Sequence, residues 1–185
     1  IFSYFVSAAL SSVILTSMIL TIGLGVIAVQ GAIYLGTSEI VKAFGVVALG
    51  SISATSIFMI VVLFFKSVSA SGAFSGMLSA ASGFIIGAYI PISQFSVNIQ
   101  TVCNIFPASQ ITIVLRNVLI NGLLEHMNTS LAGVDNGMFV TIIKELFSFK
   151  ARIFDGYLDV TQMLGYITVS ILVCIVVQII VYSKT

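Results

Sequence analysis

The segment from Asn104 to Asn117 reads NIFPASQITIVLRN, and its polar residues interrupt a chain that is strongly apolar up to that point. Pro107 opens a helix-like run, and Arg116 stands near the far end of that run. Two structures suit such a segment in a bilayer. It is either a span that buries a charge, or a hairpin that enters the membrane and turns back.

The composition places the whole chain in a membrane. Of its 185 residues, 59% are hydrophobic and 7% are charged, whereas a soluble domain carries about 25% charged residues. The net charge of +1 and the lack of a basic run give no indication of nucleic acid. Cys103 and Cys174 lie far apart in the sequence, so we predict neither a disulfide framework nor a metal site. No charged region precedes the apolar residues at Ile1, and we expect a fragment of a longer protein rather than a signal peptide.

Charged residues divide the chain into spans and connections. Nine of the thirteen charged side chains fall between Arg116 and Asp159. Crossing about 30 Å of hydrocarbon takes roughly 20 helical residues, which predicts four spans, at about 5–33, 43–65, 70–90 and 163–182. The runs are continuously apolar rather than alternating, which favours helices over strands. We therefore predict an all-α integral membrane protein, a polytopic helix bundle with a single transmembrane domain.

The third span carries regularly spaced small residues. Gly72 and Gly76 are four residues apart, as are Gly83 and Gly87, and this spacing lets two helix backbones approach closely in lipid. We predict helix packing there, and a seam that slides during a transport cycle is the alternative. The four predicted spans contain no acidic residue or histidine, which argues against a proton or sodium relay.

Residues 91–126 are predicted to form a re-entrant hairpin. As a fifth span, residues 105–124 would place Arg116 near the middle of the bilayer, at a cost of about 2.5–3.5 kcal/mol. Gln110, Asn117, Asn121 and Glu125 instead form one polar stripe of a helix. Such a stripe suits a helix that lies at an interface or packs against protein beside water.

Two prolines mark the ends of helices in this region. Pro91 follows the third span and stops it, and Pro107 suits the first turn of a new helix, where its missing N–H costs nothing. We therefore expect short helices at roughly 97–105 and 108–126, which enter one leaflet and return. Residues 138–147 have the apolar spacing of a short amphipathic helix, which either covers the mouth of the protein or lies on the membrane.

The order of these segments resembles a known family. A glycine-rich span ending in GAYIPIS is followed by NIFPASQ, by IVLRNVLING and by a last span, as in the C-terminal part of the permease subunits of type-2 ATP-binding-cassette exporters. The resemblance implies that the four spans are the third to sixth of six. It also implies a re-entrant extracellular helical hairpin before the last span, an extracellular segment over 127–157, and cytosolic positions for Lys66 and Lys184. The family pattern falls on Gly87, Pro91, Phe106, Pro107 and Arg116.

The resemblance also implies a function. A Gly-rich phosphate loop is absent from the sequence, so the chain is not expected to bind ATP or to act as an enzyme by itself. We expect a transport subunit of a bacterial plasma membrane that pairs with a second permease, identical or related, and with cytosolic ATPase subunits that hold ATP and magnesium. The expected cargo is hydrophobic or amphipathic, such as a drug, a lipid-like molecule or an antimicrobial peptide. A polysaccharide exporter of the same family, an ion-coupled carrier and a non-transporting membrane scaffold are the alternatives.

The hairpin is the expected external gate of such a transporter. Pro91 and Pro107 would set its shape, and Arg116, Asn117 and Asn121 would make polar contacts near the exit. For Arg116, a structural anchor at the lipid headgroups is the alternative, because an arginine side chain readily extends to that level.

Overall fold

The computed structural model describes residues 2–29, 34–65, 67–131 and 136–183. Its long helices are α1 (Phe2–Val29), α2 (Thr37–Leu63), α3 (Val68–Ile85), α5 (Pro107–Ser130) and α7 (Val160–Ser183). The shorter helices are the 3-10 helix η1 (Ile92–Gln94), α4 (Val97–Ile105) and α6 (Met138–Leu146). Strands β1 (Ala151–Ile153) and β2 (Gly156–Leu158) pair as a small antiparallel ribbon.

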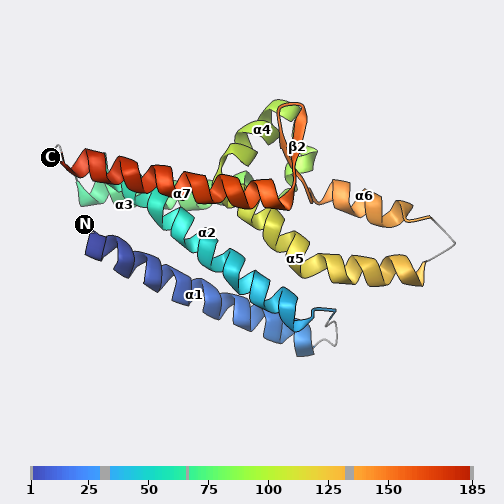
Figure 1. Cartoon of the computed structure of the whole chain (residues 1–185). Coiled ribbons are helices and arrows are strands. Elements are labelled where there is room, and N and C mark those ends of the chain that lie inside the picture. Colours follow the sequence, from blue (N-terminus) through green and yellow to red (C-terminus); the bar gives the residue numbers. More distant parts are fainter. Residues whose placement is uncertain (1, 30–33, 66, 132–135, 184–185) are drawn as a thin grey trace.

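Among the residues that the structure describes, four helices, α1, α2, α3 and α7, are long and apolar enough to cross a bilayer. A fifth crossing is added only if α4 and α5 are taken together as one bent span. In Figure 1 the ribbon of β1 and β2 rises beside α4, away from the long helices. The prediction of a multi-pass membrane helix bundle is confirmed at this level, and the ribbon is a departure from an all-helical chain.

Helix α3 ends at Ile85, five residues before the predicted end at residue 90. Gly87 takes a left-handed conformation with φ of 70°, and the N–H of Ala88 donates to the carbonyl of Gly83 at 2.9 Å. This is the closure that commonly ends helices at a glycine. The prediction that Pro91 stops α3 is therefore wrong. Pro91 is instead the N-cap residue of η1.

Helix α2 begins at Thr37, six residues before the predicted start at residue 43. Its first turn contains Glu39, whose carboxylate lies 3.7 Å from the ammonium group of Lys42. The prediction that no acidic residue falls within a span is therefore wrong at this end of α2, where the helix dipole favours a negative charge. Lys66 and Lys184, expected on the cytosolic side, lie outside the described residues.

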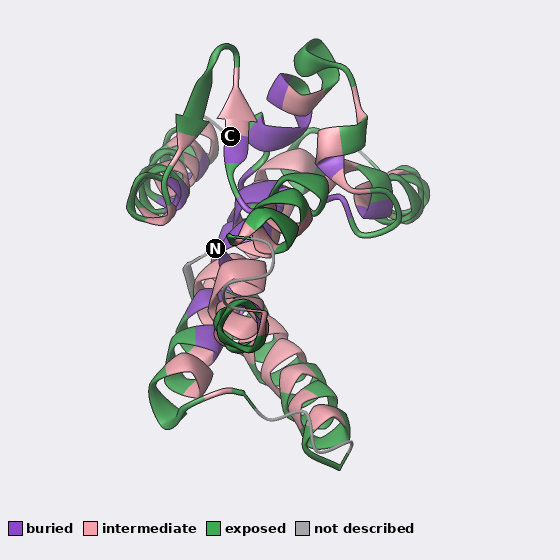
Figure 2. Cartoon of the chain, turned by 90° about the vertical axis from the view of Figure 1, so that its right-hand side faces the viewer, coloured by how far each residue is buried: buried purple, intermediate pink, exposed green. Residues whose placement is uncertain are grey.

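The buried core lies where α2, α5, α7 and β1 meet. It consists of Val46, Ile113, Val114, Ala151 and Met163. Figure 2 shows buried residues gathered around the ribbon and the helices beside it. By contrast, none of the most apolar stretch of α1 is buried within the chain. Within the described chain, helix α1 packs mainly on α2. Its other faces are left for lipid or for another chain.

The glycines of α3 make no helix–helix contact within the described chain. A methyl group added at Gly72 or Gly76 would meet no atom within 4 Å, and one added at Gly83 would meet the ring of Tyr89 from the turn that follows. A close approach occurs instead at Gly50 of α2, where an added Cβ would lie 2.9 Å from the side chain of Ile111 in α5. Helix packing by the glycines of α3 stays a prediction.

Candidate functional site

Helices α4 and α5 form a sharply bent pair. They meet at 94° across a single residue, Phe106. Phe106 has φ of −73° and ψ of 124°, the extended conformation that a residue before proline prefers. Pro107 is the first residue of α5, where its lack of an N–H is harmless. The dipeptide Phe106-Pro107 thus creates the bend, which we call the apex.

Side chains satisfy the backbone groups that the broken helices expose at the apex. The amide of Gln110 donates to the carbonyl of Asn104 at 2.7 Å. The hydroxyl of Tyr166 in α7 donates to the carbonyl of Ile105, also at 2.7 Å. The last carbonyls of a helix have no partner within it, and an unpaired carbonyl in an apolar environment is costly. Gln110 and Tyr166 therefore satisfy carbonyls at the end of α4 that have no partner within the helix.

The apex is also joined to the end of α3. Ser109, which is fully buried, donates its hydroxyl to the carbonyl of Ile85 at 2.7 Å. Ile85 is the last residue of α3, so this carbonyl too has no partner within its own helix. The first turn of α5 thus caps the third apolar helix.

Helix α4 is bound to the ribbon by two further hydrogen bonds. The amide of Asn104 donates to the carbonyl of Arg152 at 2.9 Å. The backbone N–H of Phe154 donates to the hydroxyl of Thr101, again at 2.9 Å. Asn104 is 1% exposed, so the link lies beneath the surface.

The turn after α6 is held by two side chains of α5. The guanidinium of Arg116 donates to the carbonyls of Phe147 and Ser148, the second at 3.3 Å. The amide of Asn117 donates to the carbonyl of Phe149 at 2.8 Å. Arg116 is half-buried, and its contacts are with backbone carbonyls. It acts here as a structural anchor to protein, a role that the two alternatives for Arg116, a gate contact and a headgroup anchor, did not include.

The residues before α4 contact the same turn. The N–H of Ser93 donates to the hydroxyl of Ser148 at 2.8 Å, and the hydroxyl of Ser93 donates to the carbonyl of Leu146 at 2.5 Å. Ser148 has φ of 54°, which a non-glycine residue rarely adopts. The turn at residues 147–149, which we call the anchor turn, therefore receives hydrogen bonds from η1 and from α5.

The expected gate residues lie at three separate places. Gly87 and Pro91 flank the turn after α3, and Phe106 and Pro107 form the apex. Arg116 and Asn117 bind the anchor turn about two and a half helical turns farther along α5. Asn121 follows, and its amide lies 3.4 Å from the side-chain oxygen of Asn117. The structure does not bring the seven predicted residues into one cluster.

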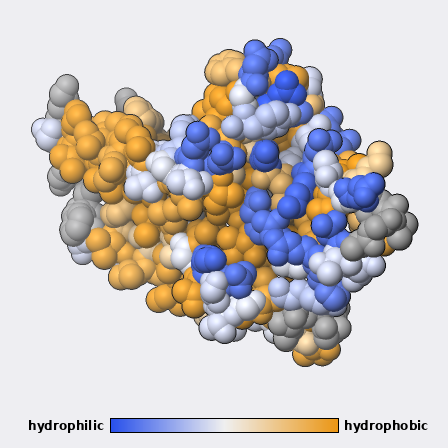
Figure 3. Space-filling model, turned by 45° about the vertical axis from the view of Figure 1, so that its right-hand side comes forward, coloured by the Kyte–Doolittle hydropathy of each residue, from blue (hydrophilic) through white to orange (hydrophobic). Residues whose placement is uncertain are grey.

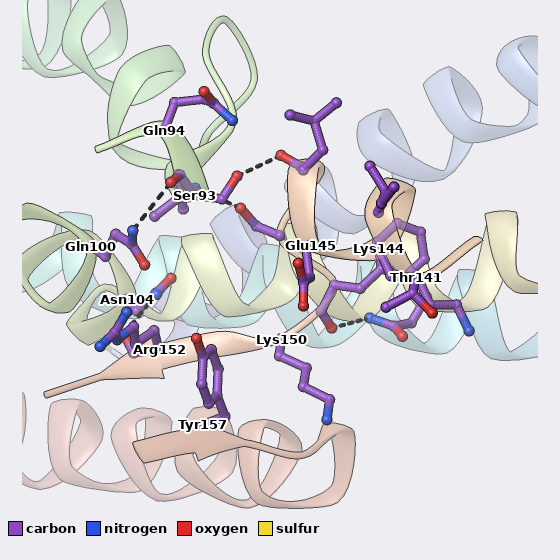
Figure 4. A pocket seen from close by; sticks show the side chains of 16 residues that line it. Ser93, Gln94, Gln100, Asn104, Thr141, Lys144, Glu145, Lys150, Arg152 and Tyr157 are labelled. Atoms are coloured by element: carbon purple, nitrogen blue, oxygen red, sulfur yellow. Dashed lines mark hydrogen bonds between the residues drawn. The ribbon is translucent and has the colours of Figure 1, made fainter. Parts of the chain in front are cut away.

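A polar cavity of about 830 Å³ lies beside the anchor turn. Its lining comes from η1, α4, α5, α6 and the ribbon, as Figure 4 shows. Asn117 belongs to this lining, whereas Arg116 lines a separate apolar groove between α1 and α5. Most polar residues of the lining were not predicted as site residues. They are Ser93, Gln94, Gln100, Asn104, Thr141, Lys144, Glu145, Ser148, Lys150, Arg152 and Tyr157.

The concentration of charge between Arg116 and Asp159 was the sequence signal for this cavity. It indicated a polar outer segment but not which side chains meet, because α4 and the ribbon lie about fifty residues apart in the sequence. Within residues 2–29, 34–65, 67–131 and 136–183, no group of three or more His, Cys, Asp or Glu side chains is placed to hold a metal ion.

Fold and site together define a multi-pass helical membrane protein with a broken helix pair and a polar cavity at one end. Comparison of the chain with family models, with curated proteins and with solved structures gives no match. Any more specific function therefore has to be argued from the bent pair and its surroundings.

Proposed function

We propose that the chain is a permease subunit of a type-2 ATP-binding-cassette exporter, with α4 and α5 as a re-entrant hairpin that gates the outer side. The observation that carries the proposal is the bend of 94° at Phe106-Pro107, where the side chains of Gln110 and Tyr166 bond the carbonyls at the end of α4. Backbone that leaves a helix within the membrane is tolerated where protein or water satisfies its polar groups. The resemblance to the exporter family comes from the same segment.

The positions of the helix ends favour a hairpin over a fifth span. The first residues of α1 and the last residues of α7 lie at the same end of the molecule (Figure 1). An even number of crossings brings a chain back to its starting side, and an odd number does not. Four crossings therefore fit this arrangement, with α4 and α5 entering and leaving from one face.

The hydrogen bonds of the anchor turn suggest how a gate would move. Four of them join residues 147–149 to α5 and to Ser93, and a fifth joins Ser93 to Leu146, just before the turn. The outer segment and the hairpin would then move as one body when neighbouring helices tilt. In the proposed cycle, cytosolic ATPase subunits that bind ATP and magnesium drive the tilt, and the moving body opens a route outward for a hydrophobic or amphipathic cargo.

A second permease copy, or a close relative, completes the proposed complex. Most of α1 is exposed within the described chain, and Gly83 is the one buried residue of α3. These apolar faces need lipid or protein around them in a bilayer. The regularly spaced glycines of α3 suit the close approach of a helix from another chain.

Co-purification and ATP hydrolysis test this proposal. The protein, expressed with its genomic neighbours and solubilised in mild detergent, should retain an ATPase in a fixed ratio. The ATPase should turn over faster with the permease than without it. Reconstituted vesicles should move an amphipathic dye only when ATP is present on the ATPase side. Transport driven by an ion gradient without any ATPase would instead support a carrier, and a complex that moves nothing would support a scaffold.

A further inference from the structure

The geometry points to a binding site for a phosphate-bearing anion in the polar cavity beside the anchor turn. Among the described residues, three cations line it, namely Lys144 of α6, Lys150 after the anchor turn and Arg152 of β1, with Glu145 as the one acidic residue. The surplus is two positive charges in a chain whose whole net charge is +1. This inference concerns binding and requires no ATPase.

The cations that line the cavity have no carboxylate partner among the residues that the structure describes. Among the residues that the structure describes, the one ion pair within 4.0 Å joins Lys42 to Glu39, far from the cavity in sequence and on another helix. Lys144, Lys150 and Arg152 thus have no carboxylate at pairing distance. Charge-assisted hydrogen bonds from ammonium and guanidinium groups to phosphate oxygens are among the stronger polar contacts in proteins.

Arg152 is held in place by its Nε and by the ring of Tyr157, and these contacts leave its two terminal nitrogens for a ligand. Its Nε donates to the carbonyl of Phe154 at 3.3 Å, and its guanidinium lies 5.7 Å from the centre of the Tyr157 ring. Figure 4 shows Arg152 and Tyr157 side by side, with Lys150 beyond them. A preoriented guanidinium loses less freedom on binding than a mobile one.

A buried acceptor provides a second, independent indication of a ligand. Asn104 lines the cavity at 1% exposure, and its side-chain oxygen has no hydrogen-bond partner within the described chain. Buried polar atoms are rarely left unpaired. A ligand that suits this cavity brings a negative charge for the three cations and a hydroxyl for Asn104. A glycerophosphate group carries both.

The cavity lies at the border of the apolar surface. Strand β2 ends at Leu158, and the membrane-crossing helix α7 begins at Val160. Figure 3 shows hydrophilic residues gathered at one end of the molecule, next to a broad hydrophobic surface. A glycerophosphate group can reach such a place from the bilayer, as a lipid headgroup, or from solution. The volume of about 830 Å³ is within the ordinary range for small-molecule sites.

Two binding measurements on the purified full chain test the inference and separate the two sources. In nanodiscs, native mass spectrometry compares retention of phosphatidylglycerol with retention of phosphatidylcholine, which has no net charge. In neutral detergent, isothermal titration measures binding of glycerol 3-phosphate at physiological ionic strength, with glycerol as the uncharged control. The variant Lys150→Gln removes one exposed cation of the cavity, and Lys42→Gln removes one exposed cation elsewhere.

Preferential retention of phosphatidylglycerol would assign the site to a lipid headgroup, and binding of glycerol 3-phosphate would show access from solution. In either case Lys150→Gln should weaken binding roughly fivefold, as expected for one basic side chain near an anionic headgroup, and Lys42→Gln should leave it unchanged. Arg152→Gln should weaken it at least as much. Failure of both probes to bind the unaltered chain would overturn the inference, as would equal losses in Lys150→Gln and Lys42→Gln.

Discussion

At the scale of single residues, the turn after α3 depends on one backbone conformation. Gly87 has φ of 70°, and a Cβ added there would lie 2.8 Å from the side chain of Ile92. The sequence named this glycine through a family pattern and a packing motif. Its actual role is a left-handed helix end, which could not be read from spacing because the motif and the helix end use the same residue type.

Replacement of Gly87 by alanine should destabilise the protein. A left-handed conformation costs a residue with a Cβ about 1–2 kcal/mol, and the contact with Ile92 adds to that cost. Gly45→Ala in α2 is the matched control, because an added methyl group meets nothing there and alanine favours a helix. A dye that reacts with the buried thiol of Cys103 reports thermal unfolding in detergent. A melting temperature lowered equally by both variants would contradict the assigned role.

Asn117 is a second residue with a defined structural role, which its side-chain amide performs. It bonds the carbonyl of Phe149 in the anchor turn and the carbonyl of Ile113 in its own helix. Arg116 and Asn117 were both expected to make polar contacts near the exit, which stays a prediction, and in the structure both bind backbone carbonyls. Sequence could identify the polar stripe, because its spacing is local. The partner of the stripe lies about thirty residues away and was not predictable from spacing.

Asn117→Leu should loosen the anchor turn without unfolding the bundle. Leaving a buried carbonyl unpaired costs about 1–3 kcal/mol, so amide hydrogen exchange across residues 147–153 should become faster by roughly tenfold or more. Asn98→Leu on α4 is the control, since Asn98 is exposed. Unchanged exchange in Asn117→Leu would show that the anchor turn does not depend on this amide.

At the scale of elements, hydropathy predicted which apolar helices exist, and α6 was anticipated from its apolar spacing. The ends of helices were less predictable. Helix α3 is shortened by its glycine turn, and α5 continues to Ser130 rather than ending at residue 126. The ribbon of β1 and β2 was missed because each strand has three residues, too few for an alternating pattern to stand out.

The sequence analysis also missed a contact between two of the apolar helices, α2 and α7. Gln178 of α7 is 4% exposed, and its amide donates to the carbonyl of Ser56 in α2 at 2.8 Å. A single glutamine in an apolar run offers no indication of its partner helix. Such a bond between membrane helices is worth about 0.6 kcal/mol on average and up to about 1.7 kcal/mol.

Gln178→Ala should therefore weaken the packing of α7 on α2. We expect a lower melting temperature in detergent, by an amount that corresponds to about 1 kcal/mol or slightly more, since a small cavity is left as well. Ser170→Ala is the control on the same helix, because the hydroxyl of Ser170 bonds the carbonyl of Ile167 within α7. If the two variants melt alike, the bond to Ser56 does not hold the helices together.

At the scale of the whole molecule, the arrangement of helices follows from contacts that lie far apart in sequence. Helix α2 is central and packs on α1, α5 and α7. Sequence alone pointed to the glycines of α3 for helix packing, whereas close approaches within the described chain occur at Gly50, next to Ile111, and at Gly122, next to the backbone of Tyr34. The polar cavity was likewise beyond prediction, because residues from η1 to the ribbon come together only when the bent pair folds against the anchor turn.

The central claim is that α4 and α5 return to the side from which they came, so that the chain crosses the membrane four times. The test uses a chain whose own cysteines are replaced by alanine. A single cysteine at Ser69 then reports the side on which α3 begins, and one at Ser183 reports the side on which α7 ends. Both positions are exposed. An impermeant thiol reagent should label both from one side of sealed vesicles, and cysteines at Thr37 and Thr129 from the other. Labelling of Ser69 and Ser183 from opposite sides would contradict the claim.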